Sequence, residues 1–305
     1  MPKLQSNGTP LTDLNGTERF ATIIVESPAP AVTRIVLNRP DSRNAQNAAM
    51  LYELNTAFND AARDDQVKVI ILAARGEHFS SGHDLRVPDF VAEMAPWDPV
   101  GTWCGFTCDG AEGRMGIEKE MFLGLSERWR NIPKVTIAQV QGKAISGGLM
   151  LIWPCDLIIA AEDALFADNT AAIGVAGAEF FNHPWEVGVR KAKEMLFTSD
   201  FLDAREAHRL GMVNHVVPRQ QLEAFTVELA SKIAKKPSFV LKLIKEAVNA
   251  AQDAQGRVNA LNTSFALHQL SHAHNEQLYG LPIDPTGLPP AIRDKATWKE
   301  KKDGR

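Results

Sequence analysis

Cysteine is scarce in this chain of 305 residues, which contains three: Cys104, Cys108 and Cys155. Three thiols cannot complete a four-thiolate zinc site, and the spacing of Cys104 and Cys108 differs from that of the redox motif Cys-x-x-Cys. We therefore expect neither a disulfide framework nor a cysteine-bound metal.

A large net charge and long apolar runs are also lacking. The 33 Lys and Arg residues nearly balance the 37 Asp and Glu residues, and the formal charge of -4 excludes a polycation that binds nucleic acid through its net charge. The longest apolar runs, such as 69–74 and 149–153, are far shorter than the about 20 residues that span a bilayer. With 45% hydrophobic and 23% charged residues, the chain has the composition of a globular protein, which excludes disordered and fibrous chains.

Both ends of the chain are polar. Residues 1–17 lack the apolar core of a secretory signal and the Arg-rich amphipathic pattern of a mitochondrial one, so a cytoplasmic location is expected by default. Residues 281–305 are broken by prolines and end in charges. We expect this tail to be extended or disordered unless it docks on another surface.

Strand-like and helix-like segments alternate along the first two thirds of the chain. Five segments have the composition of strands: 20–25, 32–37, 67–73, 135–140 and 157–161. Helical spacing of apolar residues is found in the stripe of Leu51, Leu54, Phe58 and Ala61, and at 117–130 and 148–153. This alternation predicts an α/β fold with a mostly parallel sheet, which at this length forms one large domain or two.

From about residue 191 onward the chain is predicted to be helical, with a long last helix at 237–270. A helical layer after a βα core suggests packing between subunits. On the long helix, His268, His272 and Glu276 would share one face, but the outer two would lie about 12 Å apart. That is too far for one metal ion, so a solvated or interface face is favoured and no metal site is predicted.

Two glycine-marked turns each follow a predicted buried strand, at 78–85 and 141–149. Ligands bind beyond the carboxyl ends of parallel strands, and backbone N–H groups at a helix start are unpaired and point outward. Two such N–H groups from separate turns would form an oxyanion hole. The alternative is that each glycine merely permits a positive φ in its turn. Neither turn has the lysine of a phosphate-binding loop.

At this point a resemblance becomes specific. An ordered set of motifs between about residues 18 and 265 resembles the crotonase (enoyl-CoA hydratase/isomerase) superfamily: Leu37-Asn38-Arg39-Pro40, Arg43-Asn44-Ala45, Phe79-Ser80-Ser81-Gly82-His83-Asp84-Leu85, Ile132-Pro133-Lys134-Val135, Gly142-Lys143-Ala144-Ile145-Ser146-Gly147-Gly148, Cys155-Asp156-Leu157, Ile173-Gly174 and Ala204-x-x-Ala207-x-x-x-Gly211-x-Val213.

The resemblance implies a fold and a substrate class. It implies a core spiral of ββα units at 18–200, a helical trimerisation region at 201–280, and trimers or hexamers, with 1–17 as a leader and 281–305 as a tail. The implied substrates are acyl-CoA thioesters, and no metal or redox cofactor is implied.

The resemblance also implies site residues. The N–H groups of His83 and Gly147 would form the oxyanion hole. Arg43, Ala45 and Ser81 would lie near the CoA, and Asp84 would mainly fix its loop.

Two departures from the family pattern decide the chemistry. Hydratases of this family use two glutamates, and their positions are occupied here by Met150 and Thr170, neither of which can act as a carboxylate base near pH 7. Met150 would instead line the acyl pocket. Glu179, Asp168 and His183 are the remaining acid–base candidates.

Each of these candidates has a structural alternative. Glu179 could form an ion pair, Asp168 could cap a turn, and His183 could be a packed or capping histidine. The segment 86–116, with Trp97, Trp103 and Phe106, would cover the acyl tail, or its aromatics would pack on a neighbouring helix.

Three function classes follow. The favoured one is an enzyme of the enoyl-CoA hydratase/isomerase type, a lyase or isomerase of fatty acyl metabolism, in which Glu179 or Asp168 replaces the missing pair. The second is hydrolysis of a thioester or of a β-diketone C–C bond. Ser146 as its nucleophile lacks a base at a recognisable spacing. The third is an acyl-CoA-binding protein without activity.

Overall fold

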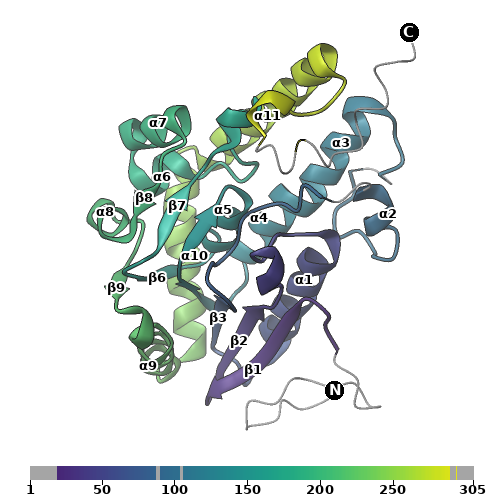
Figure 1. The fold of residues 1–305 in the computed structure, drawn as a ribbon. Helices are drawn as coiled ribbons and strands as arrows, with labels where there is room; N and C mark the ends of the chain where they lie inside the picture. The colour runs from purple at the N-terminus through teal and green to yellow at the C-terminus, as the bar shows by residue number, and fades with distance from the viewer. Residues whose placement is uncertain (1–18, 87–89, 104–105, 289–292, 294–305) are drawn as a thin grey trace.

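A six-stranded sheet forms the centre of the structure, a computed structural model that describes residues 19–86, 90–103, 106–288 and 293. Its strands follow the order β1 (Ile23–Ala29), β2 (Val32–Leu37), β3 (Val69–Ala74), β4 (Val135–Val140), β6 (Leu157–Ala161) and β9 (His215–Val217). The β1–β2 pair is antiparallel and every other pair is parallel (Figure 1). The predicted α/β class and mostly parallel sheet are therefore confirmed.

The sheet is covered on both faces, and its central strand β3 is apolar throughout. Every residue of β3 is buried, and alternate side chains of a strand point to opposite faces. Val69 and Ile71 pack in a cluster with α9 (Leu222–Ala234), whereas Ile70 and Leu72 join the larger cluster that includes α1 (Ala48–Arg63). The predicted apolar stripe lies on α1, which Asn47 caps by accepting a hydrogen bond from the N–H of Met50.

A second, three-stranded sheet lies beside the first and was not predicted. It consists of β5 (Lys143–Ile145), β7 (Leu165–Ala167) and β8 (Leu202–Asp203). Strands of two or three residues are too short to show an alternating pattern. The helix α5 (Gly147–Ile152) follows β5 after a single residue, Ser146.

The helical segment predicted at 117–130 begins earlier and has an irregular centre. It consists of α3 (Gly110–Glu118), a turn of π-helix at Lys119–Gly124, and α4 (Leu125–Arg130). Short helices elsewhere are α2 (Phe90–Met94), α6 (His183–Val187), α7 (Val189–Thr198) and α8 (Ala204–Leu210), with 3-10 turns at Pro40–Ser42, Thr170–Ile173, Arg219–Gln221 and Pro285–Gly287.

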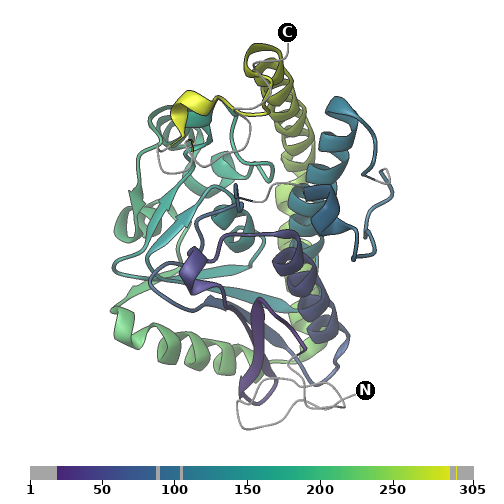
Figure 2. The same cartoon turned by 45° about the vertical axis from the view of Figure 1, so that its right-hand side comes forward.

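The C-terminal third differs from the prediction in two ways. It is not helical throughout, because it contains β8 and β9. The long helix predicted at 237–270 is two helices, α10 (Ser238–Ala254) and α11 (Arg257–Tyr279), separated at Gly256, whose φ of 92° lies in the left-handed region that ends helices. Figures 1 and 2 show α11 running alongside α3.

The first part of the C-terminal tail docks on the protein. Ile283 and Leu288 are buried against Val175, and the N–H of Asp284 donates to the carbonyl of Ile173. Residues 281–288 thus follow the exception that the prediction allowed, a tail docked on another surface. The leader at 1–17 and nearly all of the tail beyond 288 lie outside the described residues. Within the described ranges, no helix is both long enough and apolar enough to cross a membrane.

Candidate functional site

The two glycine-marked turns meet at the end of the parallel sheet. Ser80 pairs with Ala144, and a Cβ on Gly82 would lie 2.9 Å from the Ile145 carbonyl oxygen and 3.2 Å from the Gly147 nitrogen. A side chain cannot fit at that separation, and the φ of Gly82 is 87°. Glycine at position 82 thus permits both the close approach of the two turns and the left-handed backbone conformation.

The N–H groups of His83 and Gly147 lie at this junction without an acceptor among the described residues. Gly147 is the first residue of α5, so its N–H has no partner within the helix. The preceding Ser146 has φ 44° and ψ −102°. Such strained backbone persists only where neighbouring groups fix it, and it is concentrated at functional sites.

Gln46 joins the two turns, a contact that the sequence did not predict. Its side-chain amide donates to the carbonyl of Gly147 at 2.7 Å. Its own backbone N–H donates to the Gly82 carbonyl, and its carbonyl accepts from Asp84. The side chain is 1% exposed. Gln46 therefore fixes the separation of the two unpaired N–H groups.

The imidazole of His83 lies between Gly147 and Phe122. The rings of His83 and Phe122 stack with centroids 3.7 Å apart, and the π-helical turn at Lys119–Gly124 carries Phe122. Turns of π-helix inserted in α-helices are frequent at functional sites. On its other side the ring covers Gly147, where a Cβ would lie 2.6 Å from the His83 Cδ2.

Glu179 is the buried carboxylate next to this junction. It is 4% exposed, and its Oε1 lies 3.8 Å from Nδ1 of His83 and 3.6 Å from Nε2 of His268. The basic residues nearest to Glu179 are thus histidines. Burial lowers the pKa of His268, but Glu179 and Glu118 outweigh this effect and raise that pKa to about 9.

Asp168 and His183 form a second buried pair, and both are 0% exposed. Nε2 of His183 lies 2.9 Å from Oδ2 of Asp168, which also accepts from the Ala178 N–H at 2.8 Å. The other oxygen accepts from both the N–H and the hydroxyl of Thr170. Burial alone would raise the pKa of Asp168, but these hydrogen bonds hold it well below its usual range.

The surroundings of Ser146 do not activate it as a nucleophile. Its hydroxyl bonds to Oδ1 of Asp168 and to the side chain of Asn169. The carboxylate stands between the hydroxyl and His183, whereas in a catalytic triad the histidine stands between serine and carboxylate.

The two positions that depart from the family pattern carry no carboxylate. Met150 is buried in the core on α5. Thr170 uses its hydroxyl to bond Asp168 at 2.7 Å. The structure therefore places Met150 in apolar packing and Thr170 in the network of the Asp168 pair.

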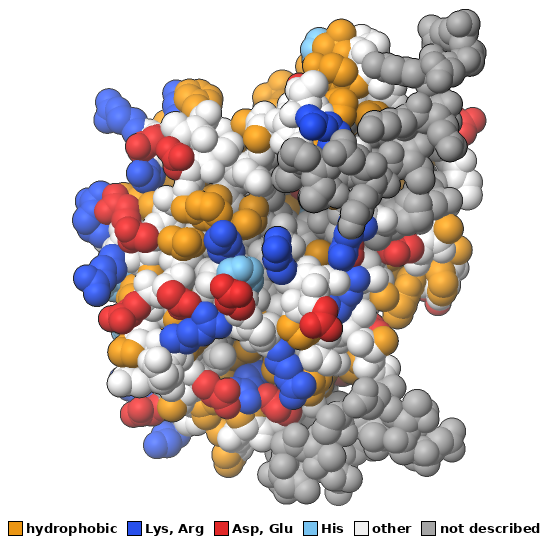
Figure 3. Space-filling model, in the orientation of Figure 1, with side chains coloured by type: hydrophobic (Ala, Val, Ile, Leu, Met, Phe, Trp, Pro, Cys, Tyr) orange, Lys and Arg blue, Asp and Glu red, His pale blue; other side chains and the backbone are white. Residues whose placement is uncertain are grey.

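The residues predicted near CoA lie together at one side of the junction. Ser81 donates its N–H to the carbonyl of Arg43 at 3.0 Å. Arg43 is exposed and has a φ of 52°, whereas Ala45 is buried. The net charge of the chain is close to zero, and Figure 3 shows Lys and Arg interspersed with Asp and Glu on the face in view. Asp84 pairs with Arg39 and Arg86, which fits its predicted role of fixing the loop.

The aromatics of the segment 86–116 separate into two groups. Trp97 stacks on Tyr52 of α1 with centroids 5.4 Å apart, and Phe106 is buried. Trp103 is exposed and lines a groove of about 540 Å³ together with Lys119 and Leu261. His83, Gly147 and Glu179 do not line this groove, so we do not assign the groove to the acyl chain.

Comparison with known proteins agrees with this arrangement. The sequence profile of the family "Enoyl-CoA hydratase/isomerase" matches residues 28–93 and 107–281. The chain belongs to the enoyl-CoA hydratase/isomerase family. The predicted crotonase resemblance is thereby confirmed.

Individual relatives match over most of the chain. A Mycobacterium tuberculosis protein named "Putative enoyl-CoA hydratase EchA13" is 47% identical over 253 residues, which is 82% of this chain and 80% of that protein. A crystal structure described as a probable enoyl-CoA hydratase from Mycobacterium smegmatis has a TM-score of 0.78 at 45% identity and covers 87% of this chain and 99% of its own. The crystal structure of an enoyl-CoA hydratase/isomerase from Xanthobacter autotrophicus Py2 has a TM-score of 0.71 at 30% identity, and the match covers 90% of this chain and 98% of its own.

The face of α11 that carries His268 and His272 was predicted to be solvated or an interface, and the first alternative is wrong. Both side chains are buried and face Glu118 of α3. Glu276 is separate from them and pairs with Arg114. The spacing of residues along α11 predicted that the two histidines share a face. It could not predict that Glu118, from the distant helix α3, lies against them.

Proposed function

We propose that the protein is an acyl-CoA isomerase of this family that acts on enoyl thioesters. The observation that supports the proposal is the pair of unpaired N–H groups of His83 and Gly147 beside the buried Glu179. The two N–H groups would hold the thioester oxygen and stabilise it as negative charge develops. The exposed Arg43, with Ala45 and Ser81, would contact the CoA portion.

Glu179 would transfer the proton. Its carboxylate takes a proton from the α carbon of a β,γ-enoyl thioester, and the electron pair of the C–H bond delocalises onto the thioester oxygen as an enolate. The same carboxyl then returns the proton to the γ carbon, which gives the conjugated α,β-enoyl thioester. Atoms and charge balance without water or a cofactor.

Asp168 and His183 would position Glu179 rather than react. The oxygens of Asp168 already accept from His183, Thr170 and the Ala178 N–H, which leaves Asp168 poorly suited to abstract a proton. Its bond to Ala178 fixes the residue directly before Glu179. The hydroxyl of Thr170 and the thioether of Met150 cannot hold and activate a water as two glutamates would, so hydration should be slow.

The test is a pair of assays on the purified protein. A 3-enoyl-CoA should be converted to the conjugated 2-enoyl-CoA, which is followed by the absorbance of the conjugated thioester, while hydration of crotonyl-CoA should be weak. Replacing Glu179→Gln should lower kcat by about 100-fold or more, because general acid–base groups contribute at least that much. The control Glu228→Gln alters an exposed glutamate on α9 and should leave kcat unchanged.

Three results would contradict the proposal. Full activity of the Glu179→Gln variant would show that another group transfers the proton. Efficient crotonyl-CoA hydration would show that Met150 and Thr170 do not prevent the family's usual reaction. Binding of acyl-CoA thioesters without turnover across a panel would indicate a binding protein instead.

A further inference from the structure

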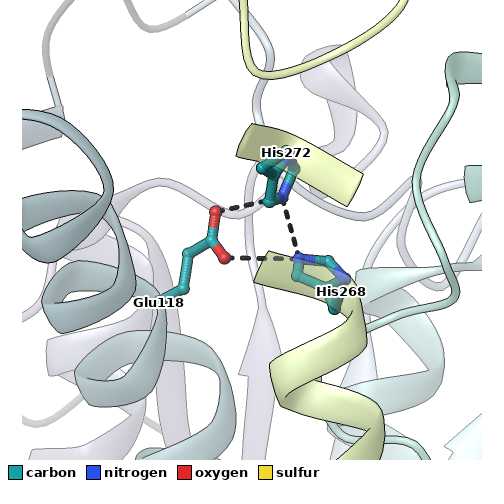
Figure 4. Close-up of side chains that lie close together, drawn as sticks. All are labelled: Glu118, His268 and His272. Carbon is teal, nitrogen blue, oxygen red and sulfur yellow. Dashed lines mark hydrogen bonds and ion pairs between the residues drawn. The ribbon is translucent and has the colours of Figure 1, made fainter. Parts of the chain in front are cut away.

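Glu118, His268 and His272 bring their polar atoms together between α3 and α11 (Figure 4). Nε2 of His268 lies 3.2 Å from one oxygen of Glu118, and Nε2 of His272 lies 3.3 Å from the other. The two Nε2 atoms are 2.9 Å apart. All three side chains are buried.

Backbone contacts determine which ring nitrogens carry hydrogen. Nδ1 of His268 lies 2.6 Å from the carbonyl oxygen of Gly177, and Nδ1 of His272 contacts that of Pro282. A carbonyl can only accept, so each Nδ1 must donate its hydrogen. In a neutral imidazole the Nε2 is then an acceptor with a free lone pair.

When both rings are neutral, the cluster directs acceptors at acceptors, and two Nε2 lone pairs and a carboxylate repel one another unless a cation lies among them. Without a metal ion that cation is a proton on His268, whose pKa the neighbouring carboxylates raise. A proton on one ring can bridge a single pair of these atoms, whereas a metal ion can bind all three residues at once.

The distances approach those around a tetrahedral metal ion. Zinc binds histidine nitrogen and carboxylate oxygen at about 2.0–2.2 Å, which places neighbouring ligand atoms about 3.3 Å apart. The two Nε2 atoms are 2.9 Å apart, and each lies 3.2 or 3.3 Å from a different oxygen of Glu118. One ligand atom from each of the three residues lies within 4.8 Å of the others, so binding through a single carboxylate oxygen requires a shift of that carboxylate. Metal-binding histidines usually donate their other N–H to a carbonyl or carboxylate, as both rings do here. Gln269 also donates to Glu118.

We propose that Glu118, His268 and His272 form a binding site for a divalent transition-metal ion of the zinc class. Two imidazoles and one carboxylate suit Zn²⁺ better than Mg²⁺ or Ca²⁺, which prefer oxygen ligands alone. The ion would join α3 to α11, and it would fix the His268 ring that lies 3.6 Å from Glu179. This site goes beyond the proposed isomerase reaction, which does not use the ion.

The first experiment measures binding to the unmodified protein. Protein treated with a chelator and then freed of it is titrated with Zn²⁺ by calorimetry, and separately with Co²⁺ while the visible spectrum is recorded. We expect one ion per chain, an increase of Tm with added Zn²⁺, and the intense absorption of tetrahedral Co²⁺. Absence of Zn²⁺ binding, or a weak octahedral Co²⁺ spectrum, would overturn the proposal.

The second experiment assigns the ligands. Replacing His272→Gln or Glu118→Gln should weaken Zn²⁺ affinity by about 100-fold or more. Even the loss of a residue that only hydrogen-bonds a metal ligand lowers metal affinity by about 10- to 100-fold. The control His274→Gln changes an exposed histidine on the same helix and should leave the affinity unchanged. Unaltered binding by both ligand variants would show an adventitious ion. The Co²⁺ spectrum of the unmodified protein decides the question if a variant does not fold.

Discussion

The side chains around the unpaired N–H groups are so closely packed that single atoms matter. A Cβ at position 147 would lie 2.6 Å from Cδ2 and 2.7 Å from Nε2 of His83, and 3.2 Å from Oε1 of Gln46. Because Gly147 does not have a positive φ, a substitution there acts through these contacts and not through backbone strain.

Gly147→Ala is therefore expected to displace the His83 ring. It should lower the free energy of unfolding by about 1–3 kcal/mol, as overpacking does, and reduce isomerase activity. His83→Ala retains the backbone N–H and removes the clashing ring, so most of the stability loss should disappear when both changes are combined. Denaturant unfolding of the four proteins of this double-mutant cycle measures the coupling. Additive losses would contradict a clash between these two residues.

Glu186 is a half-buried carboxyl whose surroundings shift its pKa in the opposite direction from that of Asp168. Burial raises the pKa of Glu186 from 4.5 to about 7, although a hydrogen bond from Asn182 partly opposes this. The folded protein thus binds this proton more tightly than the unfolded chain. The resulting stability is fully present below about pH 4.5 and is lost as the pH rises to about 7.

Glu186→Gln should remove this pH dependence. At pH 5 the variant and the unmodified protein should have similar stability. At pH 8 the variant should be more stable by about 1–3 kcal/mol, because it has no charge to bury. Chemical denaturation at the two pH values makes the comparison. An equal difference in stability between the two proteins at pH 5 and at pH 8 would show that Glu186 does not titrate in this range.

The sequence predicted some site residues and not others for a physical reason. Motifs that are local in sequence predicted the turns that hold His83 and Gly147. The same motifs showed that Met150 and Thr170 replace the usual glutamates. Gln46 and Phe122 contact the same turns from distant segments. No spacing rule links residues 46 and 147, so their contact requires the fold.

At the scale of elements, the π-helical turn between α3 and α4 organises its surroundings. It places Phe122 against His83 and directs the carboxylate of Glu120 into the protein. Glu120 accepts hydrogen bonds from the N–H groups of Val100 and Gly101 and from the hydroxyl of Tyr52. A Cβ on Gly101 would lie 2.6 Å from this carboxylate, so glycine permits the approach. One side chain thereby attaches the segment before α3 to the helix.

Glu120→Gln should loosen this attachment. The amide of glutamine cannot accept from both N–H groups as the carboxylate does, so the Val100 and Gly101 amides should exchange hydrogen about 10-fold faster or more. Hydrogen exchange read by mass spectrometry over this segment provides the measurement. The exposed Glu112 of α3 serves as the control through Glu112→Gln. Unchanged exchange in the Glu120 variant would show that other contacts hold the segment.

The sequence predicted those strands and helices that are long enough to show a periodic pattern of apolar residues. The strands at 32–37, 135–140 and 157–161 agree with β2, β4 and β6, and α8 and α9 lie in the part from residue 191 onward that was predicted to be helical. The strand β9 was missed because three residues between helices carry no pattern, although pairing with β6 stabilises it. The break between α10 and α11 was missed because an isolated glycine is tolerated within many helices.

At the scale of the whole molecule, α10 leaves a large apolar surface uncovered. Five of its side chains are exposed: Phe239, Val240, Leu243, Ile244 and Val248. The opposite face of the helix is attached to the sheet through Lys245, which donates to the carbonyl of Lys134 and pairs with Asp156. Contiguous apolar surface on a folded chain marks an interaction site. The helical layer inferred from the sequence has this property, which supports its predicted role in oligomerisation.

We therefore expect the protein to form a homotrimer or a dimer of trimers through this face of α10. A closed ring of three chains of 33.5 kDa would have a mass of about 100 kDa, which light scattering after gel filtration can measure. Ile244→Asp places a charge in the middle of the apolar surface and should shift the protein toward monomers, because an unpaired charge cannot be buried at low cost. Ala224→Asp adds the same charge at an exposed position of α9 and should leave the mass unchanged. A monomeric unmodified protein, or an oligomer that persists in the Ile244 variant, would assign the apolar surface of α10 to another role.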